Sequence, residues 1–334
     1  MAEVTEKPAA DLFATAAKLG NEQEYVRVAA LAGLLKSTTP TTVVLQEVAT
    51  CLDGTSRSVR ELAVVVLGQM GTSAVPALIR ALDKDQLSSV RIAAAAALGR
   101  AGTNAVPAAQ PLCQCLESSD ELLRWHAGFA LSRMGRPAVP HLAALLNSPD
   151  VATQCAVVGA LGRIGTEARG AAEAIKGLAV SSTPMLRLAC HAALIKISGD
   201  SSAGLPMILG NLEDKDPTVR KAAIEHLGEL QDMARPSTPR MLAMLSDSSP
   251  SARASAALTL ARIDANSPEA IQALSKLLAD SDSEVRANAA IALARFGPAA
   301  ASALPHLKNM QADDDARLAA IANGAIELLS RAAV

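Results

Sequence analysis

The stretch that decides the fold is LEDKDPTVRKAAIEHLGEL, residues 212–230. After an acidic turn, Pro217 stands where a helix can begin, because the missing N–H of proline costs nothing in the first helical turn. Val219, Ala223 and Leu227 then recur at helical spacing. This pattern predicts an amphipathic helix that begins at Pro217.

A second apolar series lies upstream of this stretch. Leu205, Ile208, Leu209 and Leu212 are also spaced as on one face of a helix, and the acidic turn separates them from Pro217. Two helices joined by so short a turn are expected to run antiparallel. The sequence unit is therefore a helix hairpin.

The hairpin is repeated along the chain around an arginine that we term the anchor. The anchors recur every 30 to 33 residues, with one glutamine among them: Arg27, Arg60, Arg91, Arg124, Gln154, Arg187, Arg220, Arg253, Arg286 and Arg317. Seven residues after the first nine anchors stand Leu34, Leu67, Leu98, Leu131, Leu161, Leu194, Leu227, Leu260 and Leu293. A period in this range predicts a solenoid. We expect an all-α fold of about ten helix pairs over residues 8–334, after a flexible tail at residues 1–7.

The boundaries of the second helix of each pair are marked by capping residues. Four positions before the anchor stand Ser56, Asp120, Asp150, Thr183, Asp216, Ser249, Asp282 and Asp313, all of types that cap helix N-termini. Eleven positions after it stand Gly71, Gly102, Gly135, Gly165 and Gly297, which suit a left-handed C-terminal stop.

The composition excludes several classes of protein. Half of the 334 residues are hydrophobic but only 1% are aromatic, so the core must consist mainly of Ala, Leu, Val and Ile. The formal net charge of −2 favours neither nucleic acid nor a membrane surface as a partner. Apolar runs are much shorter than the roughly 20 residues of a membrane span, and Met1 to Lys7 does not resemble a signal peptide. Five scattered cysteines fit a reducing, cytoplasmic setting.

The anchor arginine lies in the first turn of its helix, where the helix dipole disfavours positive charge. We therefore expect a compensating partner. Six residues before four anchors stand Asp85, Asp214, Asp247 and Asp280. These aspartates could pair with an anchor of the same unit or of the next one: Arg91, Arg220, Arg253 and Arg286. Such pairs would form a ladder of charge-assisted bonds, each worth roughly 1.5–3 kcal/mol.

The order of proline, apolar helix, Leu-x-Asp-x-Asp, Val-Arg, Ala and Leu-Gly, found from Leu82 to Gly102 and from Leu212 to Leu230, resembles the HEAT repeat. It is closest to the short bacterial, PBS-lyase-type form. The resemblance implies that the turn Asp and the anchor Arg are the family's conserved pair, and that the Val-Arg helix lines the concave face. We expect a right-handed α-α superhelix.

The helix face opposite the expected core is unusually apolar. On one helix, Trp125 and Phe129 are four residues apart with His126 beside them, and Ile92 and Leu188 occupy equivalent positions on other helices. Two interpretations are open. The face is a groove for a partner helix or peptide, or it is buried between neighbouring units, with the aromatic pair filling a packing gap.

Basic residues stand nine positions after most anchors, among them Arg100, Arg133 and Arg163. Positive charge is favoured at helix C-termini by the dipole alone. The alternative is a basic row that flanks the groove and favours an acidic, amphipathic partner.

Catalytic patterns are sparse. The five histidines fall in different repeats, the five cysteines show no metal-ligand spacing, and there is no Gly-rich phosphate loop. We expect no metal, no cofactor and no catalytic residues. The predicted function is a non-catalytic protein-protein interaction scaffold; the alternative, which the resemblance implies, is a bilin-lyase-like or other HEAT-like enzyme or enzyme subunit.

Overall fold

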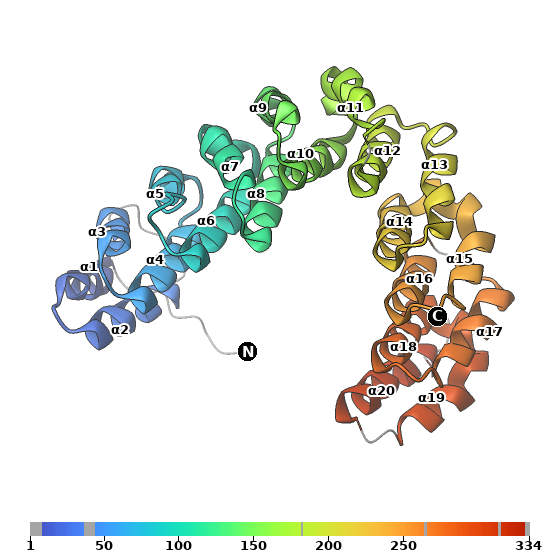
Figure 1. Cartoon of the computed structure of the whole chain (residues 1–334). Helices are drawn as coiled ribbons and strands as arrows, with labels where there is room; N and C mark the ends of the chain where they lie inside the picture. Colours follow the sequence, from blue (N-terminus) through green and yellow to red (C-terminus); the bar gives the residue numbers. More distant parts are fainter. Residues whose placement is uncertain (1–8, 37–43, 182, 264–265, 313–314, 331–334) are drawn as a thin grey trace. The chain divides into compact units, whose positions relative to one another are not determined.

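The computed structural model describes residues 9–36, 44–181, 183–263, 266–312 and 315–330. Within these ranges the regular elements are α-helices and short 3-10 turns, without strands. No helix in the described ranges has the length and apolar character needed to span a membrane. The all-α repeat architecture predicted from the sequence is therefore confirmed (Figure 1).

The helices alternate in type along the chain, and each odd-numbered helix and its successor form one pair. The first helices of the pairs, which we call A helices, are α1 (Ala9–Ala17), α3 (Leu45–Thr50), α5 (Val75–Arg80), α7 (Ala109–Leu116), α9 (Val139–Ala144), α11 (Ala172–Leu178), α13 (Gly204–Gly210), α15 (Thr238–Met244), α17 (Pro268–Leu277) and α19 (Leu304–Met310). The second helices, the B helices, carry the anchors. They are α2 (Glu24–Leu35), α4 (Arg57–Gln69), α6 (Ser88–Ala101), α8 (Glu121–Met134), α10 (Val151–Ile164), α12 (Pro184–Ser198), α14 (Pro217–Glu229), α16 (Pro250–Arg262), α18 (Ser283–Phe296) and α20 (Ala316–Ser330).

Contacts divide the chain into two compact units, residues 1–175 and 176–334, with the boundary inside α11. In each unit the A helices and the B helices form separate layers, and successive B helices pack side by side (Figure 1). The single solenoid domain expected over residues 8–334, and its handedness, stay predictions. The tail expected at residues 1–7 lies outside the described residues.

Capping residues set the ends of the B helices largely as the sequence predicts. The side chains of Ser56, Asp120, Asp150, Asp216 and Asp282 accept backbone N–H groups of the first turn. Thr183 and Ser249 occupy the same N-cap position without such a bond, and Asp313 lies outside the described residues. The five glycines predicted to end B helices all have positive φ, between 56° and 72°.

The core of each unit is built on the leucine column of the B helices. Eight of its nine members are buried, including Leu227, which has no exposed surface. The buried face is wider than the predicted stripe, because Val64 and Val66 on α4, or Ile224 on α14, are also buried. Within each unit, a B helix that lies between two other B helices packs against both of them and against its own A helix. Only a narrow strip of its surface therefore faces outward.

The α12 helix differs from the other B helices at its leucine-column position. Leu186, Cys190 and Ile197 of the predicted stripe are buried, whereas Leu194 is only half-buried. Leu188 and Ile195 are buried as well, and the position of Leu188 is also buried on α16, α18 and α20, at Ala254, Ala287 and Leu318. Leu188 therefore lies in the core of the second unit, so the expectation that Leu188 lies on the outward face is wrong.

Candidate functional site

The outward strip of α8 carries a row of exposed apolar side chains. Leu122, Trp125 and Phe129 are 54%, 54% and 38% exposed, and their spacing of three and four residues places them on one side of the helix. The Trp125 and Phe129 rings stack with their centroids 5.5 Å apart and their planes 3° from parallel. We call these three residues the aromatic ridge.

The side of α8 opposite the ridge is packed in the core. Leu123, Ala127 and Leu131, on the opposite side of α8, are fully buried. On the neighbouring helix α6, a Cβ atom added to Gly99 would lie 3.5 Å from Cδ1 of Phe129 and 3.2 Å from Cα of Ala130. The absence of a side chain at Gly99 thus lets α8 and its Phe129 ring approach α6 closely.

His126 and Ile92 lie beside the ridge. The His126 ring meets Trp125 edge to face, with the centroids 4.8 Å apart, and partial burial lowers the pKa of this imidazole. Ile92 is half-buried on α6, at the position that corresponds to Trp125 on α8. Three of the five apolar and aromatic residues predicted for the groove thus contact one another on α8, Ile92 occupies the equivalent position on the neighbouring helix, and Leu188 is buried in the second unit.

The side chains of Arg100, Arg133 and Arg163, which we call the basic row, are exposed at the C-terminal ends of α6, α8 and α10. Among the described residues, Arg100 and Arg133 make no ion pair. The corresponding lysine of the second unit, Lys196, instead donates to Glu229 over 2.7 Å. Arg100 and Arg133 thus leave positive charge available next to the ridge.

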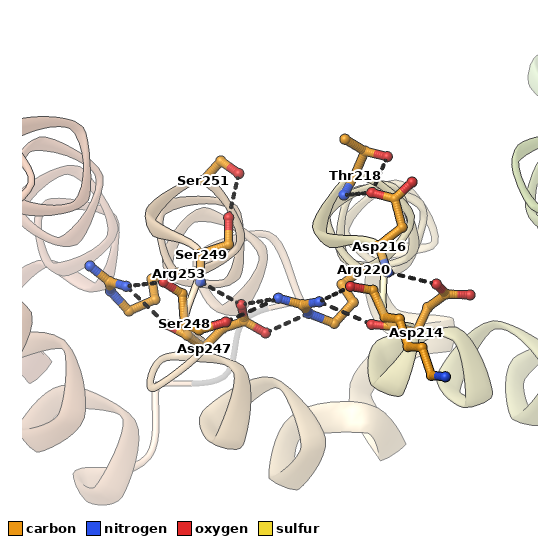
Figure 2. Close-up of polar contacts among 10 residues, drawn as sticks. Asp214, Asp216, Thr218, Arg220, Asp247, Ser248, Ser249, Ser251 and Arg253 are labelled. Atoms are coloured by element: carbon orange, nitrogen blue, oxygen red, sulfur yellow. Dashed lines mark hydrogen bonds and ion pairs between the residues drawn. The ribbon is translucent and has the colours of Figure 1, made fainter.

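The predicted arginine ladder is found in the second unit (Figure 2). Arg220 donates from Nε and Nη2 to both carboxylate oxygens of Asp247, over 2.8 and 2.6 Å. Arg253 pairs with Asp280 in the same bidentate way. Each bond joins an anchor to the turn of the following repeat. Between 8% and 14% of each of these four side chains is exposed, so the pairs lie largely out of water.

The environment of the ladder lowers the pKa of both carboxyl groups. Hydrogen bonds from Arg220 are the main cause of the lowered pKa of Asp247, and those from Arg253 of the lowered pKa of Asp280. Each carboxylate also accepts the backbone N–H two residues later, at Ser249 and Asp282. These groups are therefore stabilised in the charged form.

The anchor has a second contact, within its own repeat. Its Nη1 donates to the backbone carbonyl six residues earlier, whatever side chain stands there: Asn21, Ser118, Ser181, Asp214, Asp247 and Asp280 accept from Arg27, Arg124, Arg187, Arg220, Arg253 and Arg286. Backbone carbonyls need no particular residue type. This half of the arrangement therefore extends to repeats that lack the turn aspartate.

Asp85 and Arg91 do not form the predicted pair. The turn between Leu82 and Arg91 is one residue longer than that between Leu212 and Arg220, which leaves Asp85 exposed. Arg91 donates instead to the carbonyl of Leu82, 3.1 Å away, and approaches the sulfur of Cys115. In this turn Gln86 accepts the bond from the preceding anchor, Arg60.

The thiols are suited to packing rather than to reaction. Burial raises the pKa of Cys51, Cys115 and Cys155, and it raises the pKa of Cys113 to about 12. No group of three or more His, Cys, Asp or Glu side chains within the described ranges is placed to hold a metal ion.

Sequence reasoning missed three residues of the candidate surface. Leu122 belongs to the aromatic ridge, and its spacing of three and seven residues from Trp125 and Phe129 was a signal that could have found it. Gly128 and Gly159 lie under the guanidinium of Arg163. No sequence pattern in one helix indicates such a contact between two helices.

Comparison with known protein families gives an extensive match. The HEAT repeats family profile matches residues 43–109, 109–195 and 238–327, and a single HEAT repeat profile matches residues 205–234. Together these cover most of the chain. No curated protein matches it.

Solved structures with similar architecture include a karyopherin and an importin-beta. Karyopherin Kap121p, bound to the extreme C-terminus of the protein phosphatase Cdc14p, is 16% identical with a TM-score of 0.56, and the match covers 91% of this chain and 40% of that one. Yeast importin-beta, Kap95p, is 15% identical with a TM-score of 0.53, covering 97% and 51%. The CpcE–CpcF phycocyanin lyase complex from Nostoc is 25% identical with a TM-score of 0.46, covering 71% and 93%. The repeat pattern, the helix pairs and the profile matches together show that this chain belongs to the HEAT repeat family.

Proposed function

We propose that the chain is a non-catalytic scaffold that binds an amphipathic protein segment with an acidic flank on the B-helix face of its first unit. HEAT-repeat solenoids support protein interaction in general, and Kap121p, which shares the fold, is seen bound to the C-terminus of a phosphatase. The observation that carries the finer proposal is the aromatic ridge. Only 1% of the residues are aromatic, yet two of them stack on one exposed helix face, and an exposed apolar patch of this kind favours an interaction surface.

The chemistry of the partner follows from the two rows of side chains. The ridge offers an apolar strip that suits leucines at i, i+3, i+4 and i+7 of a partner helix. Arg133 continues the Trp125–Phe129 line at the next helical step, and Arg100 stands at the same position on α6. A partner with carboxylates along one edge of its apolar face would satisfy both rows.

A synthetic helical peptide with leucines at those positions and glutamates along one flank tests the proposal; we call it the acidic probe, and its glutamine version the neutral probe. Trp125→Ala should weaken binding of the acidic probe by about 2 kcal/mol, because tryptophans at such surfaces often dominate affinity. The melting temperature should stay nearly unchanged, since the Trp125 side chain is largely outside the core.

Two results would count against the proposal. The wild-type chain could fail to bind the acidic probe, or Trp125→Ala could lower the melting temperature sharply while binding per folded molecule is intact. The second result would identify Trp125 as core filler. A bilin chromophore retained with turnover would instead favour the lyase-like alternative.

A further inference from the structure

The first anchor, Arg27, differs from the anchors of the ladder in what its guanidinium contacts. Its Nη1 donates to the backbone carbonyls of Asn21 and Glu22, over 2.5 and 2.9 Å, as Nη1 of Arg220 does in its own turn. Within the described ranges, however, Nε and Nη2 of Arg27 make no hydrogen bond or ion pair. On Arg220 these are the two nitrogens that bind the carboxylate of Asp247.

A glycine stands at the position from which the ladder takes its carboxylate. Gly54 follows Arg27 by 27 residues, the same separation as in the two bidentate pairs. The third donor to Asp247 is the backbone N–H of Ser249, and its counterpart is Ser56, whose N–H makes no hydrogen bond to another described residue. The first unit therefore has the same three donors without an aspartate between them.

These donors border a cavity of about 310 Å³ between the turns of the first two repeats. Arg27, Gly54 and Ser56 all line it. The lining also includes three buried side chains: Leu19, Cys51 and Val59. Burial raises the pKa of the Cys51 thiol, so this group stays neutral and does not supply an anion to Arg27. A cavity of this size suits a ligand of only a few atoms.

We propose that this cavity binds a small monocarboxylate, whose two oxygens take the place that the Asp247 carboxylate has in the ladder. Nε and Nη2 of Arg27 hold it through two parallel N–H bonds, the arrangement in which guanidinium and carboxylate match best. The buried apolar lining favours an aliphatic body. Glu22, which is exposed, is the one carboxylate among the described lining residues, and it disfavours a second negative charge on the ligand.

Gly54→Asp supplies the carboxylate from the chain itself. Gly54 has φ −75° and ψ 159°, close to the −61° and 145° of Asp214, which stands at the same position before its own anchor. A Cβ atom added to Gly54 would have the carbonyl oxygen of Cys51 as its nearest neighbour, at 3.5 Å, which is ordinary contact. The variant should therefore fold, form the ladder bond to Arg27 and exclude the ligand.

Titration of the full chain with sodium butyrate, followed by heteronuclear NMR, tests the site against sodium chloride at equal ionic strength. In the wild type, the signals of the Ser56 backbone N–H and the Arg27 Nε–H should shift along one saturable curve. Gly54→Ala, the matched control without a carboxylate, should bind as the wild type does. Gly54→Asp should show no saturable shift of either signal. Arg27→Lys should weaken binding about tenfold or more, because an ammonium cannot form the bidentate pair.

The melting temperature of the first unit, read from Trp125 fluorescence, is a second measurement. Butyrate should raise it in the wild type and in Gly54→Ala, because a ligand that binds only the folded state stabilises that state. Gly54→Asp should melt higher than Gly54→Ala without butyrate and should not respond to it. Neither Gly54 variant should change binding of the acidic probe or the neutral probe, because the cavity shares no residue with the aromatic ridge.

Three results would overturn the assignment. Shifts that stay linear in butyrate concentration would mean adventitious contact only. Equal melting temperatures of Gly54→Asp and Gly54→Ala would show that a carboxylate at this position does not reach Arg27. Tighter binding of inorganic phosphate than of butyrate would rule out a monocarboxylate as the ligand.

Discussion

Each anchor arginine of the ladder bonds to two repeats at once. Nη1 of Arg220 bonds to the carbonyl of Asp214 in its own turn, while Nε and Nη2 bond to the carboxylate of Asp247 in the next. The positive charge that the helix N-terminus disfavours is thereby neutralised by a neighbour. One side chain both closes its own turn and fixes the distance to the following helix pair.

Removal of the carboxylate at Asp247 should be strongly destabilising. Asp247→Ala leaves a largely buried Arg220 without its charge partner, and breaking such a pair typically costs about 3–5 kcal/mol. Asp85→Ala is the matched control, because Asp85 occupies the same sequence offset but is exposed; its effect should be within about 0.5 kcal/mol. Urea denaturation measures both, and similar losses in the two variants would contradict the ladder as a source of stability.

The ladder also predicts how stability depends on pH. The pKa of Asp247 is lower in the folded chain than its usual value of about 3.9 in an unfolded one. Its contribution is therefore fully present above that value and is lost as pH falls through the folded pKa. The difference in free energy of unfolding between wild type and Asp247→Asn should be constant near neutral pH and shrink in acid. Denaturation at a series of pH values checks this, and a difference that grows in acid would refute it.

The residues of the ladder were only partly predictable from the sequence. The acidic turns of repeats with equal spacing could be aligned, and Asp247 and Asp280 lie where that alignment suggests. Asp85 could not be placed correctly, because a single extra residue in its turn moves it out of reach of the arginine. The bond from each anchor to the backbone carbonyl of its own turn could not be predicted from the residue types, since any residue supplies a carbonyl.

At the scale of elements, the B helices differ in how much surface they leave outward. The position directly after the anchor carries the exposed Trp125 on α8, whereas the corresponding Leu188 on α12 and Ala287 on α18 are buried. The capping residues predicted the helix ends because N-cap bonds and glycines of positive φ act locally, although Gly102, Gly135, Gly165 and Gly297 have ψ between −129° and −144° and are not in the left-handed helical conformation expected. Burial of Leu188 depends on how α12 packs against other helices, so no local signal predicted it.

Leu227→Ala and Leu194→Ala provide a matched test of how burial differs within the leucine column. Both leucines stand seven residues after their anchors, but Leu227 is fully buried and Leu194 is only half-buried. Leu227→Ala should cost about 2–5 kcal/mol through lost burial and the cavity it leaves. Leu194→Ala should cost clearly less. Equal losses in chemical denaturation would indicate that Leu194 is as deeply buried as Leu227.

At the scale of the whole molecule, the division into two compact units gives the chain two separate cores. Repeat arrays are held together by contacts between neighbours, so a local loss of stability need not spread through the array. The single tryptophan, Trp125, belongs to the first unit and reports on it alone.

Leu227→Ala in the second unit should therefore split the unfolding transition. Far-ultraviolet circular dichroism, which follows all helices, should show an earlier phase, because the second unit then unfolds at lower denaturant concentration. Trp125 fluorescence should keep its wild-type midpoint. The reciprocal variant Leu131→Ala, in the first unit, should shift the fluorescence midpoint. Coincident shifts of both signals in both variants would show that the chain unfolds as one cooperative body.

The two bidentate pairs have the same separation in sequence, so whole repeats could be inserted into this part of the chain. Arg220 and Asp247 are separated by the same number of residues as Arg253 and Asp280, and each pair connects one hairpin to the next. A duplicated segment 217–249, inserted after Ser249, would bring its own arginine, its own aspartate and a carbonyl for the arginine that follows. Each anchor arginine at the two new junctions would meet a carboxylate and a carbonyl at the spacing it has now. Lengthening by duplication thus requires no compensating substitution, which makes these repeats a natural place for arrays of this kind to grow or shrink.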